Sequence, residues 1–176
     1  MMRRMKTIVV YSTRTGNTKK VAEAIAAALP PGTPCQPLAD EPDLTAYDCV
    51  FLGFWVDRGT ANQEAQDVIR TLKNDHICLF ATLGANPKSE HAASSLKQAE
   101  ALLPDGKSAD GTFICQGAVD PKVIEMMYKK FPAGSPHGRS PERDALHAEA
   151  AKHPDAADLS QAAAFARDVY RRITEG

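Results

Sequence analysis

The segment from Ser12 to Thr18 carries the residues best suited to chemistry. It places four hydroxyl side chains, one amide and one glycine between an apolar stretch and a helical pattern. A helix N-terminus presents unpaired N–H groups and a partial positive charge, which together suit an anion. The segment lacks lysine and does not match the Gly-x-x-x-x-Gly-Lys pattern of nucleoside-triphosphate sites. We therefore predict one terminal phosphate held by uncharged donors, whereas the simpler interpretation is a cluster of N-cap residues. The predicted anion-binding residues are Ser12, Thr13, Arg14, Thr15, Gly16, Asn17 and Thr18.

The elements that must position this segment follow from apolar runs that alternate with helical periodicity. Pro34 and Pro37 interrupt the second predicted strand, which places it at a sheet edge because proline removes a ladder donor. The alternation predicts a three-layer α/β fold with helices on both faces of a parallel sheet. The predicted strands are 7–11, 33–38, 48–55, 76–81 and 112–115. The predicted helices are 21–29, 65–72, 92–103, 123–130, 142–152 and 159–173, with the helix between the second and third strands lost.

Residues that follow the other strands are further candidates, because ligands of open parallel sheets bind outside the carboxyl ends of the strands. Trp55 is the single tryptophan and ends the third predicted strand. Side chains alternate across a strand, so only one of Phe54 and Trp55 faces the ligand, and we favour Trp55. The simpler interpretation of Cys115 is a core thiol. The candidates at these ends are Phe54, Trp55, Val56, Asp57, Arg58, Gly59, Thr82, Leu83, Gly84, Asn86, Cys115 and Gln116.

The motif Thr13-x-Thr15-Gly16-Asn17-Thr18, placed after an apolar strand, resembles the FMN phosphate loop of the flavodoxin family. Leu44-x-x-Tyr47-Asp48 and Gly53 around the third strand are also similar to that family. The resemblance covers about residues 5–117 and the final helix. It implies FMN as the cofactor, a five-stranded parallel sheet in the order 2-1-3-4-5, and contact of the isoalloxazine ring with Trp55.

The chain departs from many flavodoxins in two respects. It has no aromatic residue between Ala81 and Ala92, where many flavodoxins place a second ring against the flavin. Its net charge is only −1, whereas the resemblance implies low potentials maintained by acidic groups near the reduced flavin. We hypothesise that a ring-facing Arg58 raises the second-electron potential, because a nearby cation stabilises added negative charge.

We expect residues 1–176 to form a single flavodoxin-like domain. Within it, residues 118–157 form an insertion before the final helix. This insertion mixes Met126, Tyr128, His137 and other large side chains, which suits a lid or a docking face. Four short motifs are similar to a subset of flavodoxin-like proteins that includes partners of bacterial bilirubin reductase. These motifs are 54–59, 115–117, Met126-Met127 and Pro141-Glu142-Arg143.

The composition excludes several classes of protein. With 21 basic and 22 acidic residues, the chain is not a strongly basic nucleic-acid binder. The longest apolar run is too short for a membrane span. The basic start, Met1–Lys6, is followed by an apolar stretch that is too short for the core of a signal peptide, so we expect a cytoplasmic protein. No ligand spacing predicts a metal site. The four cysteines form no Cys-x-x-Cys pair and are predicted to be free: Cys35, Cys49, Cys78 and Cys115.

Two functions remain open at this stage. The first is an FMN-binding electron carrier that passes electrons between protein redox partners, a reductase and an acceptor oxidoreductase. The second is an FMN-dependent reductase of a quinone or tetrapyrrole that uses residues 118–157 as a lid. In both, the cofactor supplies the redox chemistry and the protein supplies orientation and electrostatics. We favour the carrier and predict no acid–base or covalent catalysis by side chains.

Overall fold

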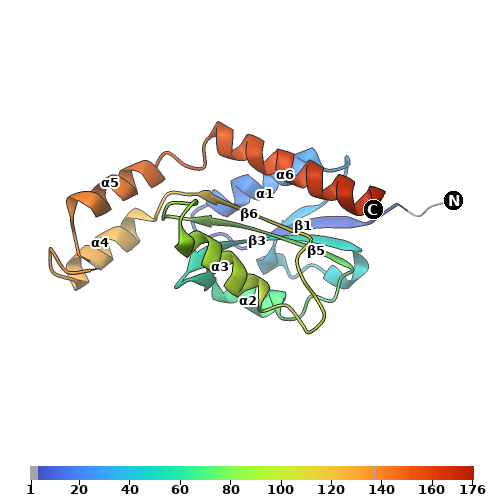
Figure 1. The fold of residues 1–176 in the computed structure, drawn as a ribbon, viewed down its shortest axis with the longest axis horizontal. Helices are drawn as coiled ribbons and strands as arrows, with labels where there is room; N and C mark the ends of the chain where they lie inside the picture. The colour runs from blue at the N-terminus through green and yellow to red at the C-terminus, as the bar shows by residue number, and fades with distance from the viewer. Residues whose placement is uncertain (1–3, 137) are drawn as a thin grey trace.

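The computed structural model describes residues 4–136 and 138–176 (Figure 1). The first three residues of the basic start and His137 of the insertion lie outside the described residues. None of the helices in the described ranges combines the length and the apolar character needed to cross a lipid bilayer.

A parallel sheet forms the middle layer of the molecule. Its strand order is β2-β1-β3-β5-β6, which confirms the predicted order 2-1-3-4-5 because β4 lies off this path. β2 lies at one edge of the sheet, as predicted from Pro37 within the strand and Pro34 directly before it. The parallel strands are β1 (Thr7–Tyr11), β2 (Cys35–Pro37), β3 (Cys49–Asp57), β5 (His76–Leu83) and β6 (Gly111–Gln116).

Helices cover both faces of the sheet, which confirms the three-layer prediction (Figure 1). On one face lie α1 (Asn17–Ala28) and α6 (Ala156–Glu175), and on the other lie α2 (Gln63–Ile69) and α3 (Glu90–Glu100). Side chains along β3 alternate between the two layers. Val50, Leu52 and Phe54 belong to the core beneath α2 and α3, whereas Cys49 and Phe51 belong to the core beneath α1 and α6.

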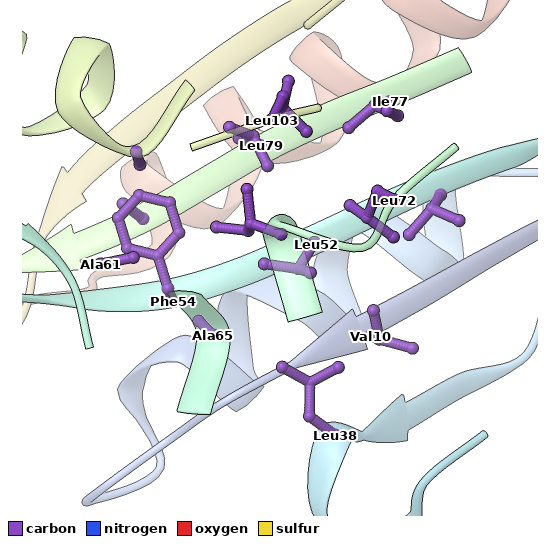
Figure 2. Packing of buried hydrophobic residues seen from close by; sticks show 14 of the residues in the cluster. Val10, Leu38, Leu52, Phe54, Ala61, Ala65, Leu72, Ile77, Leu79 and Leu103 are labelled. Carbon is purple, nitrogen blue, oxygen red and sulfur yellow. The ribbon is translucent and has the colours of Figure 1, made fainter. Parts of the chain in front are cut away.

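The core beneath α2 and α3 is shown in Figure 2, where apolar side chains from separate elements point toward one another. Phe54 lies among Ala61 and Ala65, and Leu52 lies near the middle of the group. Both Phe54 and Leu52 are fully buried. Dense packing of this kind fixes which way each β3 side chain points.

Two local features differ from the predicted elements. β4 (Thr60–Ala61) pairs antiparallel with the end of β3 and forms a tight hairpin, with Arg58 at φ 53° and Gly59 at φ 82° in its turn. A two-residue strand is too short to leave a period in the sequence. No α-helix was predicted between β2 and β3, and the structure has two 3₁₀ turns there, Leu38–Asp40 and Leu44–Ala46.

The insertion forms two short helices beyond the carboxyl ends of the strands, α4 (Pro121–Lys130) and α5 (Pro141–Ala150) (Figure 1). Both begin with proline at the first turn, preceded by a capping residue. Asp120 accepts from the N–H of Lys122, and Ser140 accepts from the N–H of Arg143. These local signals explain why both helices form although they extend away from the sheet.

Candidate functional site

A pocket of about 230 Å³ lies at the carboxyl edge of the sheet, where the last residues of β3 and β5 meet the loops after β1, β5 and β6. It brings together side chains from three of the predicted loops. The predicted residues in its lining are Thr13, Arg14, Thr15, Asn17, Thr18, Trp55, Val56, Asp57, Thr82, Leu83 and Gly84. The lining also includes Gly117, Ala118, Val119, Asp120 and Val123 from the start of the insertion.

The loop after β1 leaves the N-terminus of α1 without a side-chain cap. Gly16 is the N-cap residue at φ 97°, a left-handed conformation that favours glycine. The Thr13 hydroxyl accepts from the N–H of Gly16 at 3.0 Å, and the first helical bond runs from Lys20 N–H to Gly16 O. The N–H groups of the first turn therefore have no intrahelical acceptor, as at any helix start. Together with the Thr13 and Thr15 hydroxyls, this turn can donate hydrogen bonds to an anion.

Asn17 connects this loop to the chain after β6. Its side-chain amide donates to the Ala118 carbonyl at 2.9 Å and to the Thr15 hydroxyl at 3.3 Å. At Gly117, a Cβ would lie 3.1 Å from Asn17 Nδ2, so glycine permits the close approach of the two loops. Asn17 thus positions the far wall of the pocket.

The Thr18 and Thr82 hydroxyls lie 3.0 Å apart and are buried at the base of the pocket. This hydrogen bond joins the start of α1 to the end of β5. Because both residues are nearly inaccessible to solvent, each hydroxyl needs a partner, and the pair holds the start of α1 against the end of β5.

Trp55, Arg14 and Asp120 form one group in the pocket wall. The Arg14 guanidinium carbon lies 5.9 Å from the centre of the Trp55 ring, within the range of a cation–π contact. Arg14 Nε lies 3.5 Å from Asp120 Oδ2, and the Arg14 side chain is 49% exposed. Arg14 therefore connects the loop after β1 with the Trp55 ring at the end of β3 and with Asp120, the N-cap residue of α4.

Ser12 belongs to a hydrogen-bond network beneath the pocket. Its hydroxyl accepts from Asn62 Nδ2 at 2.8 Å and donates to Glu64 Oε1 at 2.6 Å. The Oδ1 atom of Asn62 accepts from the N–H of Trp55 at 3.2 Å. The network ties the end of β1 to the Trp55 loop, so Ser12 supports the pocket from behind.

Several predicted residues lie outside the pocket lining because they are packed in the sheet. The Phe54 side chain is fully buried in the core beneath α2 and α3. Cys115 is buried in the opposite core, and burial raises the pKa of its thiol to about 12. Gln116 is buried and donates from Nε2 to the Gly84 carbonyl at 3.1 Å. Of Phe54 and Trp55, the structure places only Trp55 at the pocket.

Other predicted residues lie outside the lining because they are exposed or act through the backbone. Arg58 and Gly59 form the turn of the β3–β4 hairpin, and Arg58 is exposed there. Arg58 is not part of the pocket lining, and its approach to a bound ring stays a prediction. Asn86 is exposed, and its Oδ1 accepts from the N–H of Lys88. Gly16 contributes its backbone conformation rather than a pocket surface.

Sequence reasoning missed Val119, Asp120 and Val123, which also line the pocket. The sequence contained a signal for them, because they follow the last predicted parallel strand, and ligands bind outside the carboxyl ends of such strands. The prediction stopped at Gln116, within the sheet itself. Gly84 shows how closely the missed segment packs, because a Cβ there would lie 2.4 Å from Val119 Cγ2.

The structure also forms a charged cluster at the start of α6 that was not predicted. His153, Asp155 and Asp158 present possible metal-ligand atoms within 4.8 Å of one another. His153 Nδ1 lies 2.5 Å from Asp158 Oδ2, and its Nε2 lies 3.2 Å from Glu149 Oε1. Asp155 and Asp158 form the capping box of α6. The cluster is explained by capping and ion pairing at the junction of α5 and α6.

The free cysteines agree with their predicted role as small apolar residues. Cys49, Cys78 and Cys115 are buried, and Cys35 is half-buried. Burial raises the pKa of the Cys35 thiol to about 11, so it stays protonated at neutral pH.

Comparison with known proteins identifies relatives of this chain. BilS from Clostridioides difficile (strain CD3), a flavodoxin-like domain-containing protein, is 32% identical over 170 residues, covering 94% of this chain and 96% of BilS. The crystal structure of oxidised Flavodoxin 2 from Bacillus cereus has a TM-score of 0.53 at 17% identity, covering 95% of this chain and 99% of that one. A flavoprotein from Lactobacillus acidophilus NCFM, solved in complex with FMN, has a TM-score of 0.50 at 16% identity, covering 63% and 93% of the two chains. The family model described as the flavodoxin domain matches residues 8–167. The chain therefore belongs to the flavodoxin domain family.

Proposed function

We propose that this chain binds FMN in the pocket at the carboxyl edge of the sheet and carries electrons between protein redox partners. The observation that carries the proposal is the uncapped N-terminus of α1, surrounded by hydroxyls in the same pocket as Trp55. The solved flavoprotein of similar fold that contains FMN supports the choice of cofactor.

The residues present fit the phosphate of FMN. In α3, α4, α5 and α6 a side chain accepts from a first-turn N–H, whereas α1 and α2 have no such side-chain cap. Glu64 lies in the first turn of α2, but the first turn of α1 contains no acidic residue. An anion would complete the hydrogen bonds of this turn and interact favourably with the helix dipole. Thr13 and Thr15 would donate from their hydroxyls, and the first-turn N–H groups would donate from the backbone.

Trp55 would provide the aromatic contact for the flavin ring. Flat rings gain about 0.5–1.5 kcal/mol from aromatic contact beyond the burial of their surface. At about 230 Å³ the pocket is smaller than the ~300–1,000 Å³ typical of cofactor sites, and Arg14 lies beside the Trp55 ring. We infer that Arg14 leaves the Trp55 ring to the flavin when the flavin binds and stays at the pocket wall beside Asp120.

The side chains of the pocket argue against acid–base or covalent catalysis by the protein itself. Its lining, within the described residues, contains Thr, Asn, Asp, Arg and apolar side chains and no histidine, cysteine or lysine. These groups do not form a nucleophile–base pair. When bound, FMN would accept and release electrons, and the chain would set its orientation and charge environment. The partners would be a reductase and an acceptor oxidoreductase.

A second candidate function is the reduction of a quinone or tetrapyrrole by bound FMN. The start of the insertion at about 118–157 favours this function, because it contributes Val119, Asp120 and Val123 to the pocket wall. We propose that the insertion belongs to a single domain over residues 1–176. Steady-state turnover with NADPH and a quinone, without added protein, distinguishes the two functions. Fast turnover would favour the reductase, and activity only through an added reductase would favour the carrier.

Titration of the FMN-free chain with FMN tests the cofactor directly. We expect quenching of flavin fluorescence with a saturable, one-to-one stoichiometry. Thr13→Ala combined with Thr15→Ala should weaken binding by about tenfold or more, since two neutral hydrogen bonds are worth ~0.5–1.5 kcal/mol each. Thr112→Ala, at an exposed position on β6, is the matched control. Wild-type affinity in the double variant would contradict the assigned phosphate site.

A further inference from the structure

One face of α4 presents an apolar side chain surrounded by basic ones. Met126 is 61% exposed and is the exposed large apolar side chain of the described residues. Lys122, Lys129 and Lys130 lie four residues before it, three after it and four after it, which places all of them beside Met126 on a helix. All three lysines are exposed. We call these four residues the Met126 face.

The charge of this face is locally positive in a nearly neutral protein. Lys129 Nζ pairs with Glu125 Oε1 at 2.9 Å, and Lys130 Nζ lies 5.6 Å from the centre of the Phe131 ring. With three lysines and the neighbouring Glu125, the exposed side of α4 has an excess of positive charge, whereas the whole chain has a net charge of −1. A face of this kind attracts carboxylates and repels other basic surfaces.

The packing of α4 leaves it available for contact with a partner. None of its ten residues is buried, whereas α1, α3 and α6, which cover the sheet, each contain buried residues. It extends beyond the carboxyl ends of the strands (Figure 1). Adaptable apolar side chains such as methionine are enriched at protein interfaces, and a central apolar contact inside a charged rim is their usual arrangement.

The Met126 face is continuous with the candidate cofactor site. Val123 of α4 lines the pocket, and Asp120, the N-cap of α4, pairs there with Arg14. A protein seated on the Met126 face would therefore lie next to the pocket mouth. This juxtaposition is what electron transfer between two bound cofactors requires.

We propose that the Met126 face docks an electron-transfer protein whose cofactor edge is ringed by carboxylates around an apolar patch. This inference rests on the proposed function, because it names the partner surface of the same site. The lysines would steer the partner by opposite charge, and Met126 would make the central apolar contact. A second copy of this chain is the competing occupant.

The first experiment needs no bound cofactor. The chain is mixed with an acidic plant-type [2Fe–2S] ferredoxin at low ionic strength and treated with a water-soluble carbodiimide. An amide bond then forms between a lysine Nζ and a carboxylate carbon, while the carbodiimide takes up the elements of water. Mapping by mass spectrometry should find the cross-links at Lys122 and Lys130. Equal cross-linking at Lys73 and Lys97, exposed lysines remote from the carboxyl edge, would overturn the proposal.

The second experiment measures transfer by stopped flow, with dithionite-reduced ferredoxin as donor and the FMN-loaded chain as acceptor. The iron–sulfur cluster loses one electron and the flavin gains it. Lys122→Glu combined with Lys130→Glu should lower the second-order rate about tenfold or more at low ionic strength, and high salt should remove the difference. Lys73→Glu combined with Lys97→Glu gives the same net charge and should transfer at close to the wild-type rate. Met126→Gln should slow transfer about fivefold at every salt concentration.

The outcomes separate this inference from the proposed function. If the chain binds no FMN, the proposed function fails, and the cross-linking still tests the docking face. If FMN binds equally in all variants but the Lys122/Lys130 variant transfers at the wild-type rate, the docking face is wrong and the cofactor assignment stands. A wild-type rate that does not depend on salt also overturns the proposal. A concentration-dependent dimer that Met126→Gln abolishes would overturn it as well, because a second copy of the chain would then cover the Met126 face.

Discussion

Arg14 shows how a single side chain can link three parts of the candidate site. Its guanidinium lies beside the Trp55 ring and pairs with Asp120. Arg58, the cation that the sequence suggested, lies instead at the exposed turn of the β3–β4 hairpin. The positive charge nearest the pocket therefore comes from the loop after β1.

Replacement of Arg14 by Gln should lower the reduction potentials of bound FMN by roughly 30–60 mV. A cation near the ring stabilises the negative charge gained on reduction, and half-exposure at this position weakens the effect through solvent screening. Potentiometric titration of the FMN-loaded variant measures the change. Arg58→Gln is the matched control and should leave the potentials close to wild type. The reverse pattern would restore the ring-facing role for Arg58.

At the scale of elements, the junction of α5 and α6 depends on one histidine. His153 contacts Asp158 through Nδ1 and Glu149 through Nε2, and Asp155 lies 3.7 Å from its Nδ1. The hydrogen bond to Asp158 is the main cause that raises the pKa of His153. The His153 carbonyl also accepts from the N–H of Ala118 in the pocket wall. Protonated His153 therefore stabilises the connection between the insertion and the final helix.

His153→Gln should reduce the free energy of unfolding by about 1–2 kcal/mol at pH 6, and by much less at pH 9. Since the pKa is raised in the folded state, the stabilisation is fully present below the unfolded value near 6.5 and is lost as pH rises through the higher folded value. Urea denaturation at the two pH values measures the difference. His91→Gln, at an exposed position on α3, is the matched control. A loss that is equal at both pH values would exclude the charged form of His153 as the cause.

Close packing between neighbouring strands gives a second prediction at this scale. A Cβ at Gly53 would lie 2.2 Å from Cε2 of the Phe80 ring, which is fully buried. Gly53→Ala should therefore destabilise the fold by about 1–3 kcal/mol, measured by the urea midpoint. Combining it with Phe80→Leu should cost less than the sum of the two single changes, because the smaller side chain leaves room. Simple additivity would show that Phe80 is not the obstacle.

For the whole molecule, cofactor binding and folding are linked. The pocket is built from loops that follow four strands distributed along the chain, so any ligand that needs it stabilises the folded state. The sheet order, rather than any single element, brings these loops together.

FMN at about 100 times its dissociation constant should stabilise the fold by about 2.7 kcal/mol and raise Tm by roughly 5–10 °C. Thermal unfolding followed by circular dichroism measures the shift. Riboflavin at the same concentration lacks the phosphate and should produce a much smaller shift, because the N-terminus of α1 stays unpaired. Equal stabilisation by the two flavins would contradict the phosphate site.

The sequence by itself determined the features that depend on local chemistry. The period of the apolar residues located all five parallel strands, and Pro34 and Pro37 identified the edge strand. The Thr13–Thr18 motif predicted the hydroxyl-rich turn at the start of α1 in the same way, because a helix start and its hydroxyls are neighbours in the chain. The hairpin strand β4 left no such signal, since two residues do not make a period.

Only the tertiary structure decided which side chains from separate loops meet. Asn17 and Ala118 are 101 residues apart in the chain, yet they share a hydrogen bond in the pocket wall. Close packing in the core turned Phe54 inward and left Trp55 at the pocket, and the tight turn placed Arg58 at an exposed position outside the pocket lining. Such contacts depend on strand order and on the volumes of buried side chains, which local spacing does not encode.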